Sequence, residues 1–81
     1  MSIKNTFVLA INGMFDAADV SSVSNTETGV AVISKRGDLL YFHEESDKEK
    51  AKSICSHLSK AVFTADKSDP YHPNWEELGL A

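Results

Sequence analysis

The spacing of apolar residues predicts one amphipathic helix over residues 46–63. Its apolar members recur at intervals of three and four: Ala51, Ile54, Cys55, Leu58, Ala61 and Val62. This spacing gathers them on one stripe of a helix. Ser46 precedes the stripe and Glu49 follows three residues later, which matches a capping box. The stripe needs an apolar surface to cover, and the preceding strands are the only candidate.

The apolar runs before the helix predict β-strands. Residues 7–11 are apolar at every position, which suits a central strand that is covered on both faces. Asn12-Gly13 then predicts a type I′ hairpin turn. The returning strand begins at Met14, is interrupted at residues 16–19, where Asp16 can cap a single turn, and resumes over residues 20–25.

Residues 30–34 and 39–43 predict a second hairpin around a turn at residues 35–38. We therefore expect an α+β fold in one domain, residues 1–81. A four-stranded antiparallel meander occupies residues 1–43, and the helix packs across one face of it. The other face is also apolar, so it needs a cover from the tail or from another chain.

The tail, residues 64–81, is expected to be irregular because Asp69-Pro70 and His72-Pro73 favour extended chain. Asn74 precedes a possible short helical turn that Gly79 would close. The expected apolar anchors of this turn are Trp75, Leu78 and Leu80.

Composition narrows the class of protein. The chain has 81 residues, so its core is modest and self-association is a reasonable way to bury more surface. The net charge of −4, without a run of Lys or Arg, argues against binding to nucleic acid or to an anionic membrane. The single cysteine excludes an intrachain disulfide and fits a reducing compartment. The apolar run at residues 7–11 is too short for a signal peptide, so we expect a cytoplasmic protein.

The side chains that could carry chemistry have simpler explanations. His43, His57 and His72 lack the spacing of metal ligands, and Cys55 lies on the buried stripe of the helix. Four carboxylates fall in turns or near the helix start, where capping explains them: Asp16, Asp19, Glu44 and Glu45. The sequence therefore predicts no enzyme, no cofactor and no metal.

Six residues are the candidates for contact with a partner. Glu44 and Glu45 begin an acidic stretch, Lys35 and Arg36 form a charged hairpin tip, and Tyr41 and Trp75 are aromatic residues on or near the sheet. Aromatic residues on a sheet can stack nucleic-acid bases, but the acidic balance favours packing in a core or an interface.

The leading hypothesis is a small non-enzymatic interaction protein that forms a homodimer through its second sheet face or an edge strand. One alternative is an acidic inhibitor or decoy that binds a larger protein complex through residues 44–49. Another is a small-ligand pocket near His57 and Tyr41. The succession of strand, glycine-bounded hairpin and capped helix over residues 20–63 is similar to many short phage and bacterial accessory proteins. This resemblance is generic and implies no functional residue.

Overall fold

A computed structural model describes residues 6–80, which form an α+β fold with two antiparallel sheets. The elements are β1 (Phe7–Ala10), β2 (Gly13–Asp16), the 3-10 helix η1 (Ala17–Asp19), β3 (Val20–Asn25), β4 (Gly29–Ser34), β5 (Leu39–Glu44) and α1 (Lys48–Thr64). Strands β1 and β2 form one sheet, and β3, β4 and β5 form the other in sequence order. The predicted α+β class is confirmed, but the single four-stranded sheet is wrong.

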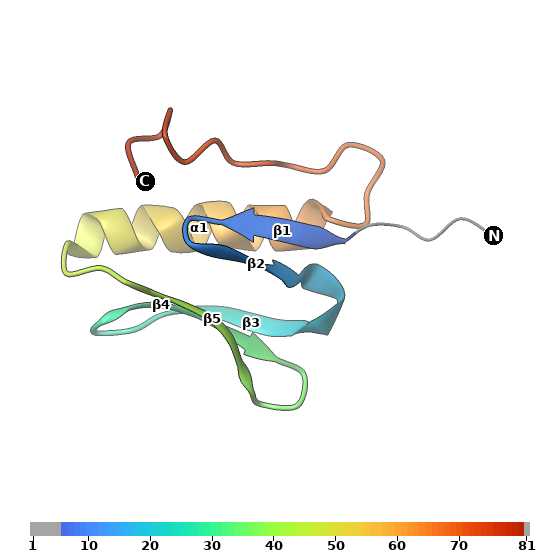
Figure 1. The fold of residues 1–81 in the computed structure, drawn as a ribbon, viewed down its shortest axis with the longest axis horizontal. Coiled ribbons are helices and arrows are strands. Elements are labelled where there is room, and N and C mark those ends of the chain that lie inside the picture. The colour runs from blue at the N-terminus through green and yellow to red at the C-terminus, as the bar shows by residue number, and fades with distance from the viewer. Residues whose placement is uncertain (1–5, 81) are drawn as a thin grey trace.

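The two sheets and the helix enclose one core (Figure 1). Helix α1 contacts β1, β3 and β4, and β2 lies beside β5. The C-terminal segment passes along α1 on the side away from the three-stranded sheet, as the orange and red ribbon in Figure 1 shows.

The η1 turn explains why there are two sheets. Asp16 caps it, as expected: its carboxylate accepts hydrogen bonds from the Ala18 backbone N–H, at 3.0 Å, and from the Thr6 hydroxyl. The backbone N–H of Ala17 also donates to the Thr6 carbonyl at 2.9 Å. The turn ends β2 before β3 begins, so the segment that the sequence presents as one interrupted strand is two strands in different sheets.

Strand β1 is not the central strand that its composition suggested. Among the strands of residues 6–80, its one pairing partner is β2. Its Val8 and Ala10 side chains lie in the core, whereas the alternate residues Phe7 and Leu9 are exposed. The hairpin joins Ala10 to Gly13, but neither Asn12 nor Gly13 has a positive φ. A type I′ turn requires positive φ at both central residues, so the predicted turn type is wrong.

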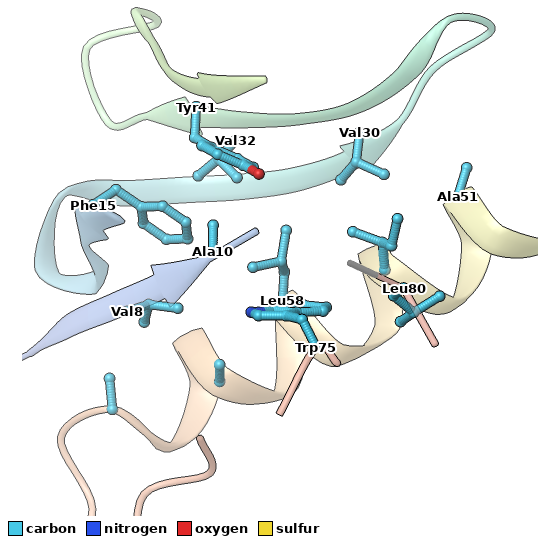
Figure 2. Packing of buried hydrophobic residues seen from close by; sticks show 13 residues of the cluster. Val8, Ala10, Phe15, Val30, Val32, Tyr41, Ala51, Leu58, Trp75 and Leu80 are labelled. Atoms are coloured by element: carbon cyan, nitrogen blue, oxygen red, sulfur yellow. The ribbon is translucent and has the colours of Figure 1, made fainter. Parts of the chain in front are cut away.

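The core draws apolar side chains from every layer (Figure 2). Its members include Val8, Ala10 and Phe15 from the hairpin, Val30, Val32 and Tyr41 from the three-stranded sheet, Ala51, Ile54, Leu58 and Ala61 from α1, and Trp75 and Leu80 from the tail. The predicted helical stripe is confirmed, with Cys55 and Val62 partly buried at its margins.

Helix α1 begins later than expected, because β5 continues to Glu44 before the chain turns. Its N-cap is Asp47, not Ser46, and the Asp47 carboxylate accepts from the backbone N–H groups of Glu49 at 3.0 Å and Lys50 at 3.3 Å. The Glu45 carboxylate accepts from the Asp47 backbone N–H at 3.2 Å. In a capping box the Glu49 carboxylate would accept from the backbone N–H of the N-cap residue. Here Glu45, which precedes the helix, accepts that bond instead.

The tail forms the expected capped turn. The Asn74 side-chain oxygen accepts from the Glu77 backbone N–H at 3.2 Å, and Gly79 closes the turn with a φ of 71°. Trp75 and Leu80 are buried anchors, but Leu78 remains 40% exposed. The tail thus covers the α1–β1 side of the core and leaves the outer faces of both sheets uncovered.

Candidate functional site

The most prominent exposed apolar pair lies on the outer face of the β1–β2 hairpin. Leu9 and Met14 are directly opposite each other across the two strands, and they are 67% and 56% exposed. We call these two residues the hairpin patch. Opposed side chains on one face of an antiparallel pair lie close enough to contact each other. The two therefore form a continuous apolar surface on a rigid element.

The alternation of strand residues creates this patch. Val8 and Phe15 point into the core, so their neighbours Leu9 and Met14 must point outward. Leu9 was expected in a central strand covered on both faces and Met14 at the start of the returning strand, so neither was among the expected contact residues. The signal in the sequence is that residues 7–11 are apolar at every position. If such a strand packs against the core through one face, its other face is an exposed apolar surface.

The tail fixes the backbone of the patch without covering its side chains. The indole N–H of Trp75 donates to the Leu9 carbonyl oxygen at 3.1 Å. This bond occupies a backbone acceptor of β1 that would otherwise lie at the strand edge. The Leu9 side chain remains largely exposed. The strand is therefore held in place while its apolar side chain faces outward.

A second exposed apolar pair lies on the outer face of the three-stranded sheet. Leu39 is 59% exposed and Phe42 is also exposed. In the register of β4 and β5 they lie opposite Ile33 and Ala31 respectively. We call Leu39 and Phe42 the sheet patch. On the same face, beyond β4, strand β3 places Ser22 and Ser24 opposite Ile33 and Ala31.

Two of the expected contact residues, Tyr41 and Trp75, belong to the core. Both are at most 9% exposed. The Tyr41 hydroxyl accepts from the Asn12 backbone N–H at 3.3 Å, and its ring centroid lies 5.9 Å from that of Phe15. Through its ring and its hydroxyl, Tyr41 therefore joins β5 to the β1–β2 hairpin. The two residues hold the fold together and present little surface to a partner.

The four charged candidates lie at opposite ends of the β4–β5 hairpin. Lys35 and Arg36 are exposed in the turn between the two strands, whereas Glu44 pairs with Gly29 at the far end. The Glu45 carboxylate already has two neighbours near the helix start. It accepts a hydrogen bond from the Asp47 backbone N–H and lies 3.9 Å from the His43 imidazole. The structure therefore does not bring the acidic and basic candidates into one site.

His57 and Tyr41, the residues near which a small-ligand pocket was expected, make their polar contacts with different parts of the fold. Nδ1 of His57 lies 2.7 Å from the Tyr71 hydroxyl, and the two rings are stacked with centroids 5.8 Å apart. His57 therefore faces the tail, while the Tyr41 hydroxyl faces the hairpin turn. Within residues 6–80, no three His, Cys, Asp or Glu side chains gather in a way that could hold a metal ion.

Comparison with known proteins adds no relative. No protein-family model, no curated protein and no solved structure matches this chain. In residues 6–80, no helix combines the length and apolar character that a membrane crossing requires.

Proposed function

We propose that this protein is a small non-enzymatic interaction protein that forms a homodimer through the hairpin patch. The observation that supports this proposal is the opposed pair Leu9 and Met14, each more than half exposed on an element whose other face is core. Exposed apolar patches on small proteins often mark interaction sites.

A second copy is the partner that fits this surface best. A two-fold interface places the same patch of both subunits in contact, so the patch must be complementary to itself. Two opposed aliphatic side chains meet this requirement because they carry no charge and no hydrogen-bonding group. The formal charge of −4 makes two copies repel each other at long range, so salt should favour the dimer.

The size of the patch sets the expected affinity. Complete burial of an apolar side chain of this size contributes about 1.5–3 kcal/mol. Scaled by the exposed fractions of Leu9 and Met14, two copies would gain roughly 4–7 kcal/mol from these residues. Association costs at least about 4 kcal/mol in lost translational and rotational freedom. The net gain is then at most about 3 kcal/mol, less than the roughly 4.1 kcal/mol that corresponds to a Kd of 1 mM. The dimer should therefore form only at millimolar concentrations, dissociate on dilution, and depend on both residues.

NMR diffusion measurements from about 0.1 mM to several millimolar test the proposal. The wild-type protein should change from monomer to dimer as its concentration rises. The double variant Leu9→Ser/Met14→Ser should remain monomeric. Leu39→Ser, which removes a comparably exposed leucine from the sheet patch, is the matched control and should dimerise like the wild type.

Far-UV circular dichroism of each variant checks that the fold is kept, since all three substituted side chains lie outside the core. A wild-type protein that stays monomeric throughout the concentration range contradicts the proposal. So does a dimer that persists in Leu9→Ser/Met14→Ser but is lost in Leu39→Ser, because that result places the interface on the other sheet.

A further inference from the structure

A groove of about 490 Å³ lies where η1 meets the C-terminal end of α1. Small apolar side chains line it from both sides: Ala17 and Ala18 of η1, and Val62 and Ala65 at the end of the helix. Alanine at three of these positions leaves space that larger residues would fill. The volume falls in the range of about 300–1,000 Å³ that is typical of small-molecule sites.

A second hollow of about 210 Å³ lies beside the groove, along β3. Val62 and Phe63 line both spaces, and Val20 adds an apolar wall to the second. Phe63 is 73% exposed in the described structure. A ligand in the groove would cover part of that ring, so an elongated apolar body suits this shape.

The charged residues of the groove favour an anion. Lys35 and Lys67 line it together with Asp66, so the described part of the lining carries a formal charge of +1 in a chain whose total is −4. The Lys67 ammonium lies 3.9 Å from the Asp66 carboxylate and 5.5 Å from the centre of the Phe63 ring. The Lys35 backbone N–H donates to the Asp19 carbonyl at 2.9 Å, which fixes that lysine beside η1.

We propose that this groove binds a small free amphipathic carboxylate, of the medium-chain or aromatic class. Its apolar body would lie against Ala17, Ala18 and Val62, and its carboxylate would be neutralised by Lys35 with a contribution from Lys67. The groove and the hairpin patch share no residue, so this site is independent of the proposed dimer.

An NMR titration of the full chain with octanoate tests this site. Saturable chemical-shift changes should concentrate at Ala17, Ala18, Val62 and Ala65. Octan-1-ol has the same apolar body without the charge and should bind about two- to fivefold more weakly, as expected for a partly exposed ion pair. Octylammonium, which carries the opposite charge, should bind more weakly still.

Two variants locate the two parts of the site. Lys35→Gln should weaken octanoate binding by about two- to fivefold and leave octan-1-ol binding unchanged. Lys48→Gln, which removes a lysine at the start of α1, is the matched control and should bind octanoate like the wild type. Ala18→Leu fills the groove from an exposed position and should abolish binding of both compounds.

Three results would overturn the proposal: no saturable shifts with octanoate, shifts centred on Leu9 and Met14, or equal affinity for octanoate and octan-1-ol. The titration is repeated in Leu9→Ser/Met14→Ser. Octanoate should bind that variant as it binds the wild type, whatever the oligomeric state. Failure of the dimer and failure of the groove are therefore distinguishable.

Discussion

The tail is expected to be part of the folded core, and substitution of Trp75 tests this directly. Trp75 is 8% exposed, its indole N–H bonds the Leu9 carbonyl at 3.1 Å, and its ring lies at 84° to the His57 ring. Truncating a buried Trp to Ala costs about 3–5 kcal/mol. At roughly 0.05–0.15 kcal/mol per residue, a chain of 81 residues has a free energy of unfolding of about 4–12 kcal/mol. Trp75→Ala should therefore remove a large fraction of the free energy of unfolding.

Trp75→Phe separates the hydrogen bond from the packing. It keeps an aromatic ring but removes the indole donor, so it should lower the free energy of unfolding by about 1–2 kcal/mol. For a domain of this size, each kcal/mol lowers the melting temperature by roughly 4–8 °C. Trp75→Phe should therefore melt roughly 4–16 °C below the wild type.

Urea denaturation followed by far-UV circular dichroism measures these differences, because the chain has a single Trp and the variants lose its fluorescence. Leu78→Ala is the matched control, since Leu78 lies in the same turn but is 40% exposed, and it should cost about 1–2 kcal/mol. If Trp75→Ala costs no more than Leu78→Ala, the tail does not contribute to the core and the reasoning is refuted.

Two further predictions concern the ends of secondary-structure elements. Asp47→Ala should cost about 0.5–2 kcal/mol because it removes the N-cap of α1, whereas Ser46→Ala should cost much less; equal losses in urea denaturation would show that the cap is not at Asp47. Hydrogen bonds from the Thr6 hydroxyl and the Ala18 N–H hold the pKa of Asp16 below its ordinary value of 3.8. The ionised carboxylate therefore stabilises the folded state above about pH 4, and this contribution is lost as the pH falls through the lowered pKa. The free energy of unfolding of Asp16→Asn should fall less than that of the wild type between about pH 6 and about pH 3. Equal losses would show that ionised Asp16 does not stabilise the fold.

The local elements were predictable because their causes are local. Apolar residues recur every three or four positions from Ala51 to Val62, and this spacing indicates an amphipathic helix. The apolar runs before it indicate strands. The side chain of Asp16 bonds a backbone group two residues away, so its capping role was also visible in the sequence. The N-cap of the helix was misplaced by one residue because Ser46 and Asp47 are both good caps, and the choice depends on where β5 ends.

The sequence predicted an uncovered apolar sheet face, but the residues of the candidate site could not be named from it because exposure depends on which layers meet. Residues 7–11 are apolar at every position, and this pattern fits both a strand buried on two faces and a strand with one exposed apolar face. The same ambiguity placed Tyr41 and Trp75 among the expected contact residues. Their aromatic side chains suit an interface as well as a core, and only the packing around Phe15 and Leu9 distinguishes the two.

By itself, the sequence determined the class of the fold, the positions of its helix and strands, and the capped turns, because these follow from interactions between residues close in the chain. The tertiary structure decided that η1 divides the strands between two sheets, that the tail packs against α1 and β1, and that Leu9 and Met14 face outward. Those outcomes depend on contacts between residues far apart in the chain, such as Trp75 with Leu9, which no local pattern encodes.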